Sequence, residues 1–282
     1  MSNNRSIRIV SDSACDIKTL CGADNFSIAP LKIITASKEY VDDDTLNLAE
    51  MVDDLARYKG KSSTSCPNIS DWIEAFDGAD EVYCITITGT LSGSYNSAMN
   101  AKKAYEEENP GKRVFVIDSL STGPEMVLII EKIRDLTKAG ESFESVCEKI
   151  GAYSKKTGLL FILESMQNLA NNGRVSPIVA KMAGLLGIRV VGRASDIGDL
   201  EPLSKPRGEK KALETLFEKM KEHGYRGGKV SIAHCINEMA AKEIEKMIKA
   251  LFPNAQTEIH VTGGLCGFYA EKGGLLVGYE KA

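Results

Sequence analysis

The sequence is poor in the residues that build metal centres and disulfide frameworks. Its 282 residues include three histidines and one tryptophan, and its seven cysteines are odd in number, scattered and without a C-x-x-C pair. We therefore expect no metal ligands, no disulfide framework and no cofactor. We interpret the cysteines as small buried hydrophobic residues; they are Cys15, Cys21, Cys66, Cys84, Cys147, Cys235 and Cys266.

The sequence also lacks long apolar runs and an excess of positive charge. No run approaches the roughly 20 apolar residues that cross a bilayer, and the first ten residues contain no signal-peptide-like apolar stretch. The formal net charge is −4, which argues against an electrostatic nucleic-acid footprint. The composition, 43% hydrophobic and 26% charged, is that of an ordinary globular protein with one large or two modest domains. We expect a cytoplasmic protein without a transmembrane segment that does not bind nucleic acid.

Two nucleotide-binding motifs are absent as well. The chain has no G-x-x-x-x-G-K-[ST] sequence, and no G-x-G-x-x-G follows its first predicted strand. Neither a polyphosphate site nor a dinucleotide site is therefore expected.

The first half of the chain alternates predicted strands and helices. Ile7–Val10, Val82–Thr88 and Val114–Ile117 are largely apolar, and helical patterns separate them. Such runs predict a parallel sheet covered on both faces. Leu31–Thr35 is a further apolar run, and Leu46–Tyr58 has the periodicity of a helix.

The second half has a different rhythm. Ile188–Val191 and Leu200–Leu203 are short strands on either side of a turn sequence, which predicts a hairpin and antiparallel pairing. We therefore predict an α/β protein of two domains. Residues 1–156 would form a Rossmann-like parallel α/β/α sandwich, and residues 157–282 an α/β domain with a mixed or antiparallel sheet.

Loops rich in hydroxyl groups follow the predicted parallel strands. Ligands of such sheets bind beyond the carboxyl ends of the strands, and helix N-termini favour anions. The Thr90–Ser94 loop suits this role best, because Gly93 lets an anion approach the backbone, although loops of this kind also simply cap helices. The loop contains no Lys or Arg, which favours a single negative charge such as a carboxylate or a phosphomonoester. The other loops of this kind are Ser11–Ser13 and Asp118–Ser119; a fourth hydroxyl cluster, Ser62–Ser65, precedes the predicted helix at Ile69.

A serine nucleophile and a distant arginine are two further candidates. Ser92 lies between a strand and a helix, but the spacing differs from the G-x-S-x-G elbow. His234 follows a strand and could act as its base, or it could be a structural histidine. Arg174 follows a tight turn just before a helix, and its guanidinium would either reach the ligand anion or cap the helix.

Residues 163–191 are unusually aliphatic around one polar turn. Most of these side chains are expected in the core, and a segment of this composition could also line an apolar tunnel. The aliphatic residues are Met166, Leu169, Met182, Leu185, Leu186, Ile188, Val190 and Val191.

Taken together, five segments resemble the DegV family of bacterial fatty-acid-binding proteins, in order and spacing over essentially the whole chain. The more specific ones are the Ser-Gly-Ser-Tyr sequence from Ser92 and the Gly-Arg-Val-Ser sequence around Arg174. The matching segments are Ile9–Ser13, Thr64–Pro67, Leu91–Ala98, Val116–Ser119 and Asn172–Ser176.

The resemblance implies a protein that buries one long-chain fatty acid. Its carboxylate would lie between the domains, held by Thr64, Ser65, Ser92, Gly93 and Arg174, with the acyl chain in an apolar tunnel. The resemblance further implies presentation of this lipid to a separate, ATP-dependent catalytic subunit of a fatty acid kinase. This chain would then have no catalytic residue and would not be an enzyme.

The chain departs from the family pattern at two positions. Tyr269 stands where the family has a histidine, and we predict that its hydroxyl binds the carboxylate instead. Cys66 stands where the family often has glutamine. Two alternatives remain, a serine-dependent esterase or acyltransferase that uses Ser92, and a binding protein for a phosphorylated small molecule.

Overall fold

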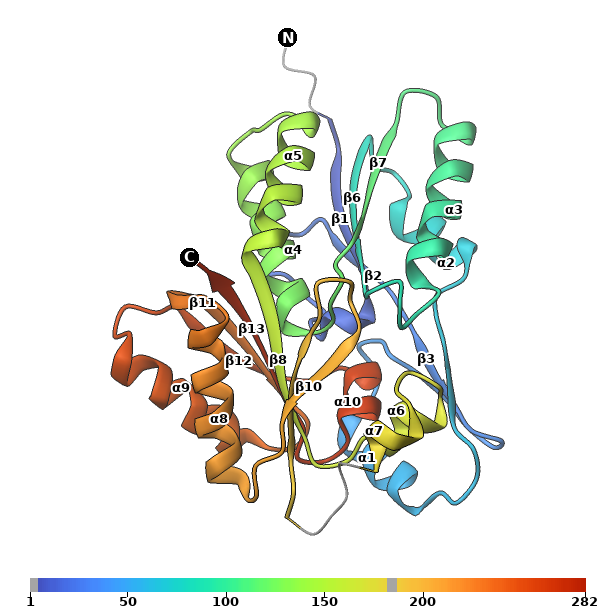
Figure 1. Ribbon diagram of the computed structural model, residues 1–282. Coiled ribbons are helices and arrows are strands. Elements are labelled where there is room, and N and C mark those ends of the chain that lie inside the picture. Colours follow the sequence, from blue (N-terminus) through green and yellow to red (C-terminus); the bar gives the residue numbers. More distant parts are fainter. Residues whose placement is uncertain (1–4, 182–186) are drawn as a thin grey trace.

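A four-stranded parallel sheet forms the upper part of the molecule, which we describe from a computed structural model for residues 5–181 and 187–282 (Figure 1). The strand order is β2-β1-β6-β7, and every neighbouring pair is parallel, as the sequence predicts. The strands are β1 (Ile7–Asp12), β2 (Phe26–Ala29), β6 (Glu81–Thr86) and β7 (Arg113–Asp118).

Helices cover both faces of this sheet because its strands are apolar on both sides. In β6, Val82 and Cys84 pack against α2 and α3, while Tyr83 and Ile85 pack against α4 and α5. Figure 1 shows the two helix pairs on opposite sides of the sheet. The helices are α2 (Ile69–Phe76), α3 (Ser94–Glu108), α4 (Pro124–Lys138) and α5 (Phe143–Tyr153).

A small antiparallel sheet lies beside the parallel one. The apolar run Leu31–Thr35 supplies its central strand and does not join the parallel sheet. The helix predicted at Leu46–Tyr58 is confirmed as α1 (Leu48–Arg57), which connects two strands of this sheet, β4 and β5. The strands, in the order β4-β3-β5, are β3 (Lys32–Ile34), β4 (Glu39–Val41) and β5 (Ser63–Ser65).

The second half of the chain forms a six-stranded mixed sheet with the order β10-β9-β8-β13-β11-β12. Only the pair β11–β12 is parallel; the predicted hairpin is confirmed as the antiparallel pair β9–β10. Helices α8 (Glu209–Glu222) and α9 (Glu238–Leu251) cover one face. The strands are β8 (Thr157–Leu163), β9 (Val190–Ala194), β10 (Leu200–Ser204), β11 (Tyr225–His234), β12 (Thr257–Val261) and β13 (Leu275–Lys281).

Short helices complete the chain. Ser176 caps α7 by accepting a hydrogen bond from the Val179 amide, and Asn68 forms a capping box with Asp71 at the start of α2. No helix in the described parts of the chain is long and apolar enough to cross a membrane. The remaining elements are α6 (Gln167–Asn171), α7 (Pro177–Ala180), α10 (Gly264–Ala270) and the 3-10 turns η1 (Ser13–Cys15) and η2 (Ser154–Lys156).

The two larger sheets are joined by direct packing of α4 on β13. A Cβ atom placed on Gly278 would lie 2.5 Å from the backbone nitrogen of Glu125, so the first turn of α4 rests directly on the strand. Glu125 also accepts a hydrogen bond of 2.7 Å from the Thr157 hydroxyl at the start of β8. The division into residues 1–156 and 157–282 stays a prediction. Across that boundary, α4 of the first segment packs on β13 of the second.

This packing generates a prediction about stability. We expect Gly278→Ala to lower the free energy of unfolding by at least about 2 kcal/mol, because its methyl group would overlap helix backbone that cannot move aside. Gly151→Ala is the control: it lies exposed in α5 with no atom within 4 Å of its added methyl group. That variant should gain about 0.5–1 kcal/mol from helix propensity. Urea unfolding of both variants measures the effect, and equal stability of Gly278→Ala and the wild type would contradict the packing argument.

Candidate functional site

An apolar cavity of about 280 Å³ lies between the mixed sheet, α10 and the loops at the carboxyl ends of the parallel strands. Its floor comes from β8, where Leu159, Phe161 and Leu163 point to one face while Leu160 and Ile162 point to the opposite helix-covered face. This alternation is the ordinary period of a strand. The lining residues are Leu31, Thr64, Ser65, Cys66, Ile87, Leu91, Ser92, Gly93, Thr122, Leu159, Phe161, Leu163, Leu169, Arg174, Leu200, Leu265, Cys266, Tyr269, Ala270 and Leu276.

The cavity gathers every residue that the sequence proposes for carboxylate binding. Thr64 and Ser65 come from β5, Ser92 and Gly93 from the loop before α3, Arg174 from the turn after α6, and Tyr269 from α10. They lie far apart in the sequence and converge because the three sheets share this cavity. Their role as ligands stays a prediction.

Thr64 and Tyr269 are in direct contact. Their hydroxyl oxygens lie 2.9 Å apart, so one donates a hydrogen bond to the other. Burial raises the pKa of Tyr269, an effect that the Thr64 hydroxyl and the Arg174 guanidinium partly offset. The Tyr269 hydroxyl therefore stays protonated at neutral pH and is available as a donor.

Ser92 lies at the start of α3 with its hydroxyl oxygen already used as an acceptor. The Ser94 amide donates to Ser92 Oγ at 3.2 Å, which leaves the hydroxyl proton of Ser92 free to donate. The side chain thus accepts a hydrogen bond from the first residue of a 15-residue helix, whose N-cap residue is Gly93, and can donate a hydrogen bond into the cavity. The positive end of the helix dipole adds to the attraction for an anion.

Arg174 is held by the backbone of both halves of the chain. Gly173 has a φ of 73°, a left-handed conformation that suits glycine, and this turn brings the Arg174 amide to the Leu169 carbonyl at 2.8 Å. The guanidinium Nε donates to the Leu91 carbonyl at 3.0 Å, and Nη1 donates to the Asn172 carbonyl. Nη2 has no hydrogen-bond partner among the described residues and remains available.

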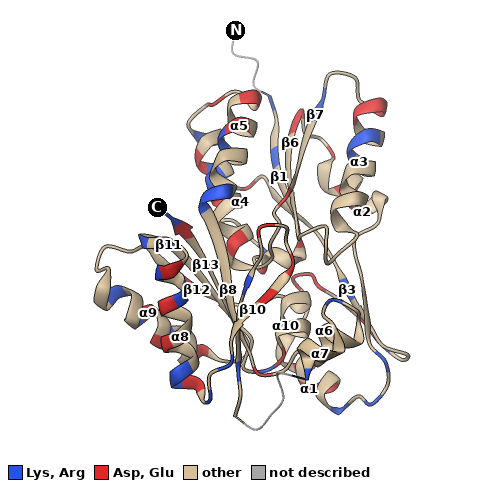
Figure 2. Ribbon diagram, in the orientation of Figure 1, with Lys and Arg blue, Asp and Glu red and all other residues tan. Residues whose placement is uncertain are grey.

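The cavity is polar at its half-buried end and apolar where it is deepest. Ser92, Arg174 and Tyr269 are half-buried and Gly93 is exposed, whereas the apolar lining residues Leu159, Phe161, Leu163, Leu265 and Leu276 are buried. Arg174 is the one charged residue among the described lining residues. Figure 2 shows that α6, α7 and α10 carry no charged residues.

The aliphatic stretch 163–191 contributes less to the cavity than the sequence suggested. Of the described residues named there, Leu169 lines the cavity, Met166 and Val190 pack behind it, and Val191 faces α8 and α9. Met182, Leu185 and Leu186 lie outside the described residues. Most of the apolar wall comes instead from β8, β13 and α10, of which the sequence singled out Tyr269 alone as a site residue. The available signal for β8 was the uninterrupted apolar run Leu159–Leu163, which is typical of a strand buried on both faces.

The histidine proposed as a base for Ser92 does not face it. His234 ends β11, and its Nδ1 accepts a hydrogen bond from the Asn237 amide at 3.2 Å. The described lining residues include no histidine. The placement of His234 therefore gives the esterase hypothesis no support.

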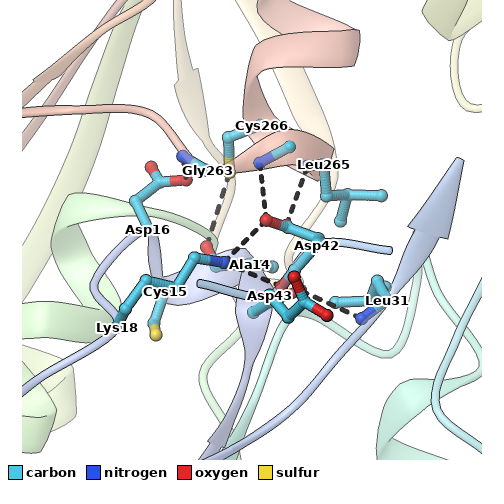
Figure 3. Close-up of polar contacts among 12 residues, drawn as sticks. Ala14, Cys15, Asp16, Lys18, Leu31, Asp42, Asp43, Gly263, Leu265 and Cys266 are labelled. Carbon is cyan, nitrogen blue, oxygen red and sulfur yellow. Dashed lines mark hydrogen bonds and ion pairs between the residues drawn. The ribbon is translucent and has the colours of Figure 1, made fainter. Parts of the chain in front are cut away.

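Helix α10 is held at its N-terminus by two buried carboxylates (Figure 3). Asp42 accepts hydrogen bonds from the amides of Gly264 at 2.7 Å and Leu265 at 2.9 Å, and Asp16 accepts one from Gly263 at 2.7 Å. Lys18 forms an ion pair of 2.7 Å with Asp42. Because α10 contributes Leu265, Cys266, Tyr269 and Ala270 to the cavity, these contacts position one of its walls.

Comparison with known proteins places these features in a family. The model of the DegV family, described as uncharacterised, matches residues 6–282. A DegV domain-containing protein of Streptococcus pneumoniae is 44% identical over 276 residues, which cover 97% of this chain and 98% of that protein.

Two solved structures are similar over the whole fold. A DegV family protein of Eubacterium eligens, loaded with heptadecanoic acid, has a TM-score of 0.96 and 45% identity, covering 98% of this chain and 100% of that one. The fatty acid kinase B3 protein of Streptococcus pneumoniae, loaded with linoleic acid, has a TM-score of 0.96 and 44% identity, with the same coverage.

The anchor of α10 generates a prediction about pH. Burial raises the pKa of Asp16 to about 7, well above the ordinary range of an aspartate, against the opposing effect of the hydrogen bond from the Gly263 amide. The folded state thus keeps a proton that the unfolded state releases between about pH 4 and 7, so this group's contribution to stability falls as pH rises through that window. We expect the free energy of unfolding of the wild type, relative to Asp16→Asn, to fall by about 1–2 kcal/mol between pH 5 and 7.

Urea unfolding of both proteins at the two pH values measures this difference. Asp24→Asn, which removes an exposed carboxylate, controls for the loss of one charge. A difference between wild type and Asp16→Asn that rises or stays constant with pH would show that Asp16 does not retain its proton.

Proposed function

The chain belongs to the DegV family, and we propose that it binds one long-chain fatty acid in the cavity between its sheets. The observation that carries this proposal is the polarity of the cavity: one cation and several hydroxyl groups lie at its half-buried end, and its deep end is apolar. A fatty acid has the same polarity, with one negative charge at one end of an apolar chain. The relatives described as loaded with heptadecanoic and linoleic acid support this choice of ligand.

The apolar part of the cavity accounts for most of the expected affinity. Burial of each methylene contributes roughly 0.8 kcal/mol, so an acyl chain of about 16 carbons offers on the order of 12 kcal/mol before the costs of ordering and association. The described residues that line this part of the cavity are uncharged, so an acyl chain can lie there without leaving a charge unpaired. A lipid held in this way should remain bound during purification.

The polar end determines the orientation of the ligand. The free Nη2 of Arg174 and the hydroxyl proton of Ser92 would donate to the carboxylate, and Tyr269 or Thr64 would supply a further donor. One guanidinium matches one carboxylate, whereas a phosphomonoester carries more charge than a single arginine balances. The lining therefore favours a carboxylate over the phosphorylated ligand considered above.

We also propose that the chain presents its lipid to a separate kinase subunit. The half-buried position of Ser92 and Arg174 and the exposure of Gly93 would leave the carboxylate within reach of a partner. The relative named fatty acid kinase B3 supports this role. With no histidine among the described lining residues, we assign the phosphoryl-transfer chemistry to the partner and propose no catalytic residue in this chain.

The first test is the lipid itself. Protein purified from a bacterial host should carry about one non-covalent fatty acid per chain, because the buried acyl chain dissociates slowly. Mass spectrometry of the native and the denatured protein should differ by the mass of a fatty acid, and organic extraction should recover that acid. If extraction recovers no stoichiometric lipid and the protein also fails to bind added fatty acid, the proposed function is refuted.

The second test removes single hydroxyl groups at the polar end. Ser92→Ala and Tyr269→Phe should each weaken fatty acid binding by roughly 10- to 150-fold, since a hydrogen bond to a charged group contributes about 1.5–3 kcal/mol. Tyr153→Phe is a matched control, because that hydroxyl donates to Glu280 outside the cavity. Binding to all three variants can be measured by competition with a fluorescent fatty acid.

The same variants distinguish fatty acid binding from the remaining hypothesis, that the protein is an enzyme with Ser92 as its nucleophile. If Ser92 were a nucleophile, the wild type would hydrolyse an ester substrate and Ser92→Ala would lose turnover while binding that substrate normally. Wild-type affinity in both Ser92→Ala and Tyr269→Phe would place the carboxylate elsewhere.

A further inference from the structure

Phe161 of β8 lines the floor of the cavity, and Gly192 lies beside it on the neighbouring strand β9. The two residues face each other across the antiparallel pair, in direct register. A Cβ atom placed on Gly192 would lie 2.4 and 2.6 Å from two ring carbons of Phe161. The ring therefore occupies the space that a side chain at position 192 would need.

Glycine is unusual at this position, because it weakens a strand interior and here has no turn to make. In β9 its neighbours on the cavity side of the sheet are Val190 and Ala194, and both pack in the core around the cavity. A glycine inside a strand often marks a site where another group approaches closely. Here that group is the Phe161 ring, which is buried and lines the cavity.

Neighbouring side chains limit the movement of the ring along the sheet. Leu159 and Leu163 flank it along β8, and Leu276 is its register partner on β13, on the side away from Gly192. All three of these side chains line the cavity as well. A ring displaced from Gly192 would therefore enter the cavity and reduce the space for the ligand.

From this geometry we infer that the Phe161–Gly192 pair sets the length of acyl chain that the cavity accepts. Gly192 leaves the space beside its Cα to the ring, and the ring in that position defines the depth of the floor. A side chain at position 192 makes the cavity smaller, and a smaller side chain at position 161 makes it larger. The inference rests on the proposed fatty acid binding and names a determinant of its specificity.

The test compares affinities for myristic, stearic and arachidic acid, saturated acids of increasing length, by competition with a fluorescent fatty acid. Gly192→Ala should lower the preference for stearic over myristic acid at least about fourfold, the effect of one methylene that no longer fits. Phe161→Leu should raise the preference for arachidic over stearic acid by a similar factor. The double variant should return toward the wild type, because leucine leaves room for the added methyl group.

Gly158→Ala is the matched control. Gly158, in β8, is like Gly192 a buried strand glycine close to an aromatic ring: a Cβ atom placed on it would lie 3.1 Å from Tyr279 Cζ. Tyr279, however, is not among the described residues that line the cavity. This variant should lose stability and keep the wild-type order of affinities. An equal change of chain-length preference in Gly158→Ala would mean that general loosening of the sheet, and not the Phe161–Gly192 pair, sets the selectivity.

The methyl group added in Gly192→Ala would also lie 2.8 Å from the Glu201 carbonyl oxygen, so this variant could fail to fold. In that case Phe161→Leu alone still tests the inference. A wild-type preference in Phe161→Leu overturns the inference, while its fatty acid binding leaves the proposed function intact. A wild type that binds none of the three acids overturns the proposed function and this inference together.

Discussion

The rest of the site depends on the contact between two buried aspartates and the first backbone amides of α10. Asp16 and Asp42 belong to the first half of the chain, and the amides of Gly263, Gly264 and Leu265 belong to its last fifth. This contact draws the C-terminal helix into the first half, where it places a cavity wall and the Tyr269 hydroxyl. Helix N-termini leave their first amides without partners, so a carboxylate at that point satisfies both groups.

Burying several carboxyl groups next to α10 costs electrostatic free energy, but it fixes the position of the helix. Asp12, Asp16 and Asp42 are all buried, and Lys18 is the cation paired with Asp42. Burial raises the pKa of both Asp12 and Asp16 to about 7. A buried ionic group bonded to backbone amides tolerates few alternative positions, which suits a helix that must hold a hydroxyl group at a defined place.

Close backbone approach serves the cavity in two ways. At Gly278 it lets α4 rest on β13, which brings the mixed sheet against the parallel sheet and encloses the space between them. At Gly192 the missing side chain leaves room for the Phe161 ring, which keeps that space open. The same property of glycine, the absence of a side chain, therefore closes the outside of the cavity and enlarges its inside.

The sequence by itself determined the features that depend on neighbouring residues. Apolar runs predicted β1, β6 and β7 and a parallel sheet, and the turn sequence between two short strands predicted the β9–β10 hairpin. The loops around Ser92 and Arg174 could be named because hydroxyl groups and tight turns at strand ends are local signals.

Only the tertiary structure decided which distant segments meet. Strand β2 went unpredicted, because a short edge strand has little periodicity of its own. The apolar run Leu31–Thr35 was visible in the sequence, but its place in a separate sheet with β4 and β5 was not, because the run does not name the strands it pairs with. The pairing of β8 with β13, the burial of Asp16 and Asp42 against α10, and the seat of Phe161 on Gly192 join residues remote in sequence. A hydrophobic pattern indicates that one face of an element is buried, but it does not indicate which element covers that face. The hydrophobic effect is non-directional, and many apolar surfaces could cover the same face. The partner is selected by packing and by hydrogen bonds that form only when the whole chain is folded.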